Sequence, residues 1–425
     1  MKNRRQLIKN ITLAGVSIPF VNVNGFNTLN QDYLHSLKQK LTLESSDEKF
    51  WKLVRKEYTL SKDYINMNNA GCSPQSIPVQ KAFNEYNKLS NEIPSYYMSG
   101  FLDKKRLELK RKIAIFSGCS AEEIVINRNT TEALETIIFG LDLNKGDEVV
   151  LSEYDYPHMI FAWEQRAKRD GIVLRYVDFN FPEENENKII KKYKELFNEK
   201  TKLVQITHMI NYTGQILPVK KIADVANQNN IEVLVDAAHT FSHLDMNISD
   251  LNCDYYATSF HKWLCAPFGT GMLYVNKDKI DKIWPLLASK DPNSDLIEKF
   301  ESLGTRSLSA ECAVGVALDF SNFITIKRKE KRLRFLKDYW LKKVSKIDNV
   351  KVYTSFNPIF SCGLATIGFD NKDPNQLEYF LLEKYKIHVT TIEYKNIRGI
   401  RISPNIYTSL DDLDYLVKGI KEFVL

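Results

Sequence analysis

Short apolar runs alternate with amphipathic stretches from about residue 60 to about residue 290. Seven runs are rich in Val, Ile and Leu without strict alternation, which is typical of strands covered on both faces. They are EEIVINRN, DEVVLSEY, VLRYVDF, KLVQITHM, IEVLVDAA, DYYATSF and GMLYVN. Helical stretches such as TTEALETIIFGL and PVKKIADVANQNN separate them. The alternation predicts an α/β domain with a mainly parallel sheet.

The pattern changes in the last third of the chain. The segment TIKRKEKRLRFLKDYWLKKV predicts a basic helix, whose charged side chains we expect on a solvated face. A strand, a turn and a closing helix are predicted after it, in IRGIRISPNIYTSLDDLDYLVKGIKEFV. We therefore expect a large domain over residues 76–300 and a smaller α+β domain over residues 301–425, preceded by an N-terminal arm over residues 29–75.

Composition narrows the class of protein. The 425 residues are 44% hydrophobic, which is ordinary for a globular chain. The net charge is +6, but Lys2, Arg4, Arg5 and Lys9 lie within the first nine residues, and the rest of the chain is nearly balanced. This balance disfavours nucleic-acid binding. The six cysteines are scattered without a C-x-x-C pair, so we expect free thiols.

Residues 1–28 have the pattern of an export signal. The paired Arg4 and Arg5 precede an apolar stretch, residues 11–23, that is too short to span a bilayer comfortably. The segment resembles a twin-arginine signal, which carries folded proteins across a bacterial inner membrane. It predicts a periplasmic protein with no stable membrane anchor. A disordered basic tail on a cytoplasmic protein is the alternative.

The segment TSFHKWLCAPFGTG places Lys262 among aromatic and apolar neighbours. Such neighbours predict a buried ammonium group, whose pKa is lowered because loss of water penalises the charged form. A lysine of this kind can act as a nucleophile, a Schiff-base former or a proton carrier.

Other polar residues follow the ends of predicted strands, where doubly wound sheets bind their ligands. Thr130 and Thr131 begin a helix, which suits a phosphate, although they could simply cap that helix. Asp236 ends a buried strand and needs a cationic partner, such as a protonated pyridine nitrogen. Ser259 and His261 accompany the lysine.

The motif LVDAAHTF followed by SFHKWLCAPFGTGMLYV resembles the class V aminotransferase family of fold-type I pyridoxal-phosphate enzymes. The resemblance extends from about residue 60 to the end of the chain. It implies pyridoxal 5'-phosphate as cofactor, an amino acid as substrate, and a large α/β domain with a smaller C-terminal domain.

The same resemblance assigns roles to individual residues. It makes Lys262 the Schiff-base lysine and Asp236 the partner of the pyridine nitrogen. It implies that His239 and Asn211 bind the phenolic oxygen of the cofactor and that Tyr156 stacks on its ring. It also implies that the phosphate is bound by Ser259, His261 and Thr130 or Thr131. Thr305 is implied to reach the phosphate of a neighbouring subunit, which predicts a homodimer.

Arg401 matches the arginine that binds a substrate α-carboxylate. Alternatively it pairs with Asp411 or Asp412, and Arg398 or Arg306 takes its role. Asn211 and Tyr156 could be ordinary turn and core residues. A metal site at His239 and His243 with nearby Asp236 and Asp245 is disfavoured, because a strand-to-loop context does not give this pair helical spacing.

The segment HVTTIEYKNIRGIR contains no cysteine, which disfavours desulfuration through a persulfide relay. The short loop and the GTRS segment resemble the isopenicillin N epimerase-like branch of the family, which implies epimerase or aminotransferase chemistry. A C–S or C–C lyase remains an alternative, as does a non-catalytic binding protein on the same fold.

Overall fold

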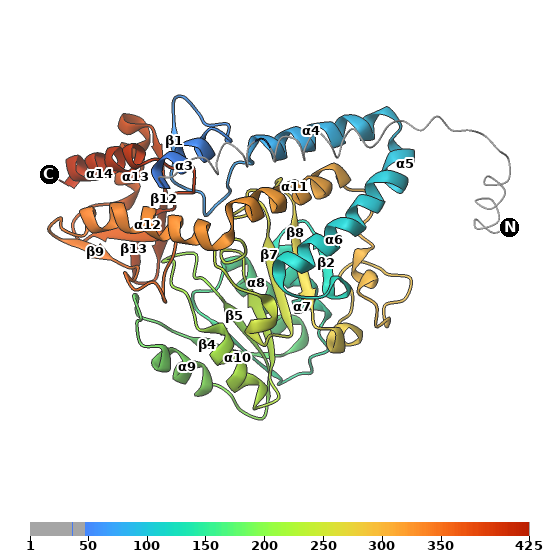
Figure 1. Ribbon diagram of the computed structural model, residues 1–425. Helices are drawn as coiled ribbons and strands as arrows, with labels where there is room; N and C mark the ends of the chain where they lie inside the picture. Colours follow the sequence, from blue (N-terminus) through green and yellow to red (C-terminus); the bar gives the residue numbers. More distant parts are fainter. Residues whose placement is uncertain (1–35, 37–46, 425) are drawn as a thin grey trace. The chain divides into compact units, whose positions relative to one another are not determined.

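The computed structural model describes Ser36 and residues 47–424 (Figure 1). The predicted signal over residues 1–28 lies outside these residues, as does most of the first half of the predicted arm. Contacts group residues 47–424 into a single unit. Within the described part of the chain, no helix has the length and apolar character needed to cross a membrane.

A seven-stranded sheet forms the centre of this unit (Figure 1). Its strand order is β2 (Ile124–Asn127), β8 (Gly271–Val275), β7 (Tyr255–Ser259), β6 (Glu232–Asp236), β5 (Thr201–Thr207), β3 (Glu148–Ser152) and β4 (Val173–Val177). The pairs from β7 to β4 are parallel, and β8 runs antiparallel to both neighbours. All seven runs predicted as strands therefore join one mainly parallel sheet.

Helices cover both faces of the sheet because successive strand residues point to opposite sides. Val233 and Val235 pack on one face, and Leu234 between them packs on the other. The first face is covered by α4 (Ile77–Glu92), α6 (Asp103–Ser117), α9 (Glu186–Lys194), α10 (Val219–Asn227) and α11 (Leu308–Ile324). The second face is covered by α7 (Thr130–Gly140) and α8 (Pro157–Asp170).

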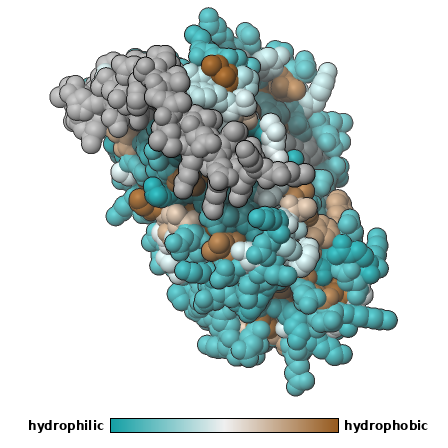
Figure 2. Space-filling model, turned by 90° about the vertical axis from the view of Figure 1, so that its right-hand side faces the viewer, coloured by the Kyte–Doolittle hydropathy of each residue, from teal (hydrophilic) through white to brown (hydrophobic). Residues whose placement is uncertain are grey.

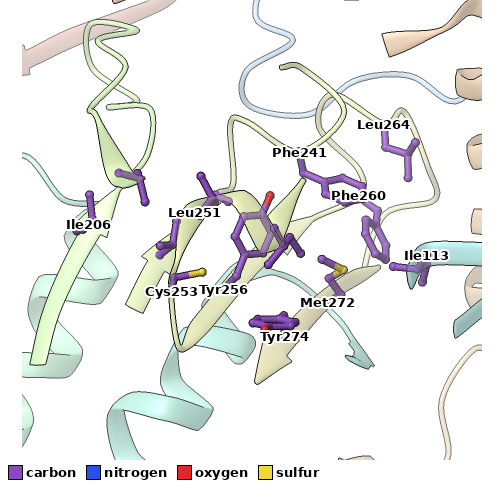
Figure 3. Close-up of a cluster of buried hydrophobic side chains, with 14 of the residues drawn as sticks. Ile113, Ile206, Phe241, Leu251, Cys253, Tyr256, Phe260, Leu264, Met272 and Tyr274 are labelled. Carbon is purple, nitrogen blue, oxygen red and sulfur yellow. The ribbon is translucent and has the colours of Figure 1, made fainter. Parts of the chain in front are cut away.

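The loop after β7 is anchored in the first core layer (Figure 3). Phe260 and Leu264, which bracket Lys262, are both buried there. The Phe260 ring packs on Phe241, with ring centroids 5.3 Å apart. These apolar anchors fix the backbone on either side of the lysine.

A second core is built from the C-terminal part of the chain and one N-terminal residue, Met67. Its sheet has the antiparallel order β12 (Thr390–Tyr394), β13 (Ile397–Ile402), β10 (Ala365–Phe369) and β9 (Val350–Val352). Its helices are α12 (Ile326–Val344), α13 (Pro374–Tyr385) and α14 (Leu410–Val424). A separate two-stranded sheet pairs β1 (Ile65–Asn66) with β11 (Ile387–His388) in parallel.

The remaining helical segments are short or lie at the periphery of these cores. They are α3 (Asp47–Arg55), α5 (Pro94–Tyr97), η1 (Met98–Leu102), η2 (Ala121–Glu123), η3 (Ile248–Leu251), η4 (Lys277–Lys282) and η5 (Ile297–Glu301). Figure 2 shows a largely hydrophilic face with scattered hydrophobic side chains.

We expected the charged side chains of helix α12 to lie on a solvated face, but three of its cationic side chains are buried. Lys329 donates to the Trp263 carbonyl and to Ser242 Oγ, and Lys337 donates to Ser361 Oγ. Arg332 pairs with Glu48 on α3. Hydrogen bonds to loop residues and an ion pair with α3 therefore compensate for burying these charges.

The predicted boundary between residues 300 and 301 stays a prediction. Helix α11 lies beyond that boundary, yet its buried side chains belong to the core of the large sheet. It packs against α4 and α6. The second core includes α12 residues from Leu336 onward.

Gly399 permits close contact between β13 and β10. A Cβ at this position would lie 2.0 Å from the Ile367 carbonyl oxygen, whereas a Cβ at Gly100 would meet nothing within 4 Å. We expect Gly399→Ala to lower the free energy of unfolding by about 2 kcal/mol, because backbone atoms must separate. Gly100→Ala, in the helical segment η1, should not lower it and should raise it by at most about 1 kcal/mol, because alanine favours a helix over glycine. Urea unfolding of both variants tests this, and equal stabilities would contradict it.

Candidate active site

A cavity of about 420 Å³ lies where the parallel strands end. Every predicted site residue except Thr305 lines it: Thr130, Thr131, Tyr156, Asn211, Asp236, His239, Ser259, His261, Lys262 and Arg401. These residues follow β2, β3, β5, β6 and β7, end β6 or β7, or belong to β13. The carboxyl ends of neighbouring parallel strands meet at one edge, so residues far apart in sequence converge there.

The lysine and the acid share this cavity and influence each other electrostatically. Burial lowers the pKa of Lys262 to about 8, while the Asp236 charge acts in the opposite direction. Burial raises the pKa of Asp236, and a hydrogen bond from the Ala238 N–H together with the Lys262 charge counteracts this. Asp236 accepts that hydrogen bond at 3.0 Å. The site thus combines a readily deprotonated amine with a buried carboxyl group.

The two histidines of the site are held as neutral rings. Burial lowers the pKa of His239 well below its ordinary value, and the Lys262 and Arg401 charges add to the effect. Nε2 of His239 lies 3.5 Å from Lys262 Nζ. Burial and the Lys262 charge likewise lower the pKa of His261 to about 4. Neutral imidazoles can donate or accept hydrogen bonds without adding charge to the cavity.

The start of α7 and the end of β7 form a hydroxyl pair. Thr130 Oγ1 and Ser259 Oγ are 2.7 Å apart, and Ser259 Oγ also accepts from the Thr130 N–H at 2.9 Å. Asn129 caps the helix by accepting from the Glu132 N–H at 2.9 Å. The cap that Thr130 or Thr131 could have supplied is therefore provided by Asn129. Hydroxyls beside a helix N-terminus suit an anionic group such as phosphate.

Arg401 reaches the cavity from β13 and is only 7% exposed. Its guanidinium donates to the Asn211 carbonyl and to Asn68 Oδ1, each at 3.0 Å. Burial lowers its pKa to about 10. It makes no ion pair with a carboxylate of the residues described, and Asp412 pairs with Arg55 instead. A buried arginine without an anionic partner favours binding of an anionic ligand.

Tyr156 and Thr305 occupy different environments. Tyr156 directly precedes α8, lines the cavity and is 40% exposed, so its ring is available to a ligand. Thr305 is exposed and lies outside the cavity of its own chain. Its predicted contact with a neighbouring subunit stays a prediction.

Besides Asn129, which caps α7, three polar side chains of the lining were not predicted from the sequence: Asn68, Thr207 and Thr390. Thr207 ends β5, so the rule that located Asp236 could have found it. Asn68 follows β1 and is held at the site by long-range pairing, of β1 with β11 and of Asn68 itself with Ser403 after β13. Thr390 lies opposite Arg401 in the β12–β13 register. Local sequence patterns carry no signal for either of these placements.

The alternative metal site finds no support in this geometry. His243 Nδ1 bonds to the His239 carbonyl at 2.7 Å, and its Nε2 accepts from the Gly363 N–H at 2.9 Å. Both ring nitrogens are therefore engaged with backbone groups. Among the residues that the structure describes, no group of three or more His, Cys, Asp or Glu side chains could hold a metal ion.

Removing the Asp236 charge should lower the pKa of Lys262 further below about 8, because this carboxylate favours the charged amine. We expect Asp236→Asn to lower it by about one unit. The pH dependence of Lys262 acetylation in cofactor-free protein, followed by peptide mass spectrometry, measures the shift. Asp245→Asn, at an exposed position on the following loop, is the control. An unchanged or raised pKa in Asp236→Asn would refute the coupling.

Comparisons with known proteins agree with this geometry. The family described as aminotransferase class-V matches residues 65–416. A probable cysteine desulfurase of Methanothermobacter thermautotrophicus is 28% identical over 345 residues, 78% of this chain and 84% of that protein. The isopenicillin N epimerase of Amycolatopsis lactamdurans is 24% identical over 393 residues, 88% of this chain and 98% of that protein.

The solved structure of a cysteine desulfurase from Thermococcus onnurineus NA1 has the same fold. Its TM-score is 0.78 at 24% sequence identity, with 87% of this chain and 97% of that chain covered. The family match covers most of the chain, including both main sheets and every residue predicted to line the site. The chain belongs to the class V aminotransferase family.

Proposed function

We propose that this protein is a pyridoxal-phosphate-dependent enzyme that acts at the α-carbon of an amino acid. One observation carries the proposal: a single cavity joins a partly buried amine, a buried carboxyl group, a hydroxyl pair at a helix start and an arginine that makes no ion pair with a carboxylate of the described residues. An aldehyde, a ring nitrogen, a phosphate and a substrate carboxylate need these four groups.

The cavity also contains polar atoms that lack partners within the described chain. Asn211 Oδ1, His261 Nδ1 and Arg401 Nε are buried without hydrogen bonds. Buried polar atoms are normally satisfied, so these three fit a site that is completed by a polar ligand. Lys262 would hold the cofactor covalently, Asp236 would pair with its ring nitrogen, and Thr130, Ser259 and His261 would hold its phosphate.

Bound pyridoxal phosphate supplies an electron sink for negative charge that develops at the substrate α-carbon. Asp236 would keep the proton on the ring nitrogen, and Arg401 would orient the substrate through its carboxylate. Lys262 Nζ is the proton carrier of the site. With a pKa of about 8, it can both take up and release a proton near neutral pH.

Epimerisation or transamination is our first choice of reaction. In the hairpin β12–β13, Tyr394 donates to the Glu153 carbonyl at 2.8 Å, and Asn396 at the turn accepts from Tyr154 at 3.0 Å. This docked turn and the strands beside it contain no cysteine, which disfavours a persulfide relay. A C–S or C–C lyase is the second candidate, because the chain is similar to cysteine desulfurases. A non-catalytic binding protein is the third.

We further propose a homodimer in which Thr305 reaches the phosphate site of the partner chain. Thr305 is exposed in the segment before α11. The preceding segment exposes four large apolar side chains, Trp284, Leu286, Leu287 and Leu296. Apolar side chains exposed close together in sequence favour burial against another protein surface.

The purified protein should take up pyridoxal phosphate, absorb visible light and exchange the α-proton of at least one amino acid for deuterium. Lys262→Ala should lose the cofactor absorption that borohydride bleaches in the wild type. Absorption spectroscopy and NMR of an amino-acid panel measure both effects. A wild-type protein that stays colourless after reconstitution would overturn the proposal.

The products distinguish the candidate reactions. Inversion at the α-carbon without a change in constitution indicates epimerisation or racemisation, a keto acid indicates transamination, and sulfide or a cleaved carbon skeleton indicates a lyase. Arg401→Lys should keep the colour but raise KM for the amino acid about tenfold or more, because lysine lacks the bidentate geometry. Colour without any reaction would favour the binding protein.

We also propose export to the periplasm through the twin-arginine pathway, supported by Arg4 and Arg5 ahead of the apolar stretch. The alternative is a cytoplasmic location. Changing both arginines to lysine should abolish export, because this pathway requires the arginine pair. Fractionation of expressing cells measures the periplasmic share, and an unchanged share in the double variant would refute the assignment.

A further inference from the structure

A hydrogen bond from Trp263 determines which nitrogen of His239 carries a proton. The Trp263 indole is fully buried, and its Nε1–H donates to His239 Nδ1 at 3.4 Å. An Nδ1 that accepts a hydrogen bond carries no proton, so a neutral His239 carries its proton on Nε2. That nitrogen lies 3.5 Å from Lys262 Nζ.

His243 contacts both Trp263 and His239 and so stabilises this arrangement. Its ring stacks on Trp263, with ring centroids 3.7 Å apart and an interplanar angle of 26°. The Gly363 N–H donates to His243 Nε2 at 2.9 Å, so Nδ1 carries the proton and donates to the His239 carbonyl at 2.7 Å. A Cβ at Gly363 would lie 2.7 Å from His243 Nε2, so this approach requires glycine.

Helix α12 holds the other side of Trp263. Lys329 is buried, and its ammonium donates to the Trp263 carbonyl and to Ser242 Oγ. The tryptophan is thus fixed by a ring stack, a carbonyl contact and its indole hydrogen bond. This combination leaves the indole little freedom to release His239.

We propose that Trp263, supported by His243, is a positioning residue that fixes the Nε2–H tautomer of His239 and thereby favours the neutral form of the Lys262 amine. An N–H group facing an ammonium group places two donors against each other. A neutral amine instead offers its lone pair to that N–H. The neutral amine is also the nucleophilic form of a lysine.

Other charges act on the same amine, and the tautomer effect adds to them. Burial lowers the pKa of Lys262, Asp236 and Cys72 raise it, and Arg401 lowers it. The pKa of His239 is lowered by burial and by Lys262, Arg401 and His243. None of these contributions depends on the indole hydrogen bond, so a change at Trp263 can be separated from them.

Nitrogen NMR of cofactor-free protein labelled with ¹⁵N-histidine tests the tautomer in the unaltered chain. We expect His239 to show a protonated Nε2 and an unprotonated Nδ1 at pH 7. The opposite tautomer, or an imidazolium ring, would overturn the proposal without any variant. Comparison with His239→Gln assigns the resonance.

The variant Trp263→Phe removes the indole N–H and keeps an aromatic ring. His239 could then adopt the Nδ1–H tautomer, and its Nε2 would accept a hydrogen bond from the Lys262 ammonium. We expect the pKa of Lys262 to rise by about one unit, so that acetylation of Lys262 at pH 7 slows about tenfold. Peptide mass spectrometry of cofactor-free protein measures the rate.

Trp340→Phe is the matched control, because Trp340 is equally buried and its Nε1 has no hydrogen-bond partner among the described residues. It should leave Lys262 acetylation unchanged. A folded Trp263→Phe protein with unaltered acetylation would overturn the proposal. If that variant does not fold, the tautomer in the wild type decides.

The inference concerns the amine that the proposed function uses, but its test does not require cofactor or substrate. If His239 shows the Nε2–H tautomer but the protein never binds pyridoxal phosphate, the proposed function alone is refuted. Cofactor bound at Lys262 together with the opposite tautomer would refute this inference alone.

Discussion

Removing the Lys262 amine from water is the physical constraint on which the site depends. Desolvation and the Arg401 charge lower its pKa, the Asp236 charge partly offsets them, and the net pKa is about 8. A pKa in this range makes the amine both a nucleophile and a proton carrier near neutral pH. The carboxyl group, whose pKa is raised by burial, depends in turn on a nearby cation for its ionised form.

The fold creates this environment in two steps. Parallel strands bring Thr130, Asp236 and Lys262 to one edge of the large sheet, while Phe260 and Leu264 anchor the lysine loop in the core. The second sheet then adds Arg401 and Thr390, which lie opposite each other in the β12–β13 register. The cavity therefore needs both cores to be folded and in contact.

The sequence predicted the large sheet well because its strands are continuous apolar runs and its helices are amphipathic. Residues at the carboxyl ends of those strands, such as Asp236, could be located by the same pattern. The pattern could not place Asn68, which reaches the cavity through the pairing of β1 with β11 and its own bridge to Ser403. Nor could it show that Lys329 on a basic helix is buried, because its partners Ser242 and Trp263 come from distant loops.

The network behind the lysine was equally invisible to local patterns. From the sequence, Trp263 looks like an ordinary core residue, yet its indole N–H donates a hydrogen bond to His239. The Gly363 backbone, 120 residues beyond His243 in the chain, completes that network. Such contacts arise from tertiary packing and leave no periodic signal in the sequence.

The central claim is that Lys262 binds the cofactor aldehyde. Its most direct test is borohydride reduction of the reconstituted protein, followed by peptide mass spectrometry. The account predicts one pyridoxyl phosphate group per chain, on the peptide that contains Lys262. A label on another buried lysine, such as Lys329, or an unlabelled Lys262 peptide would contradict it.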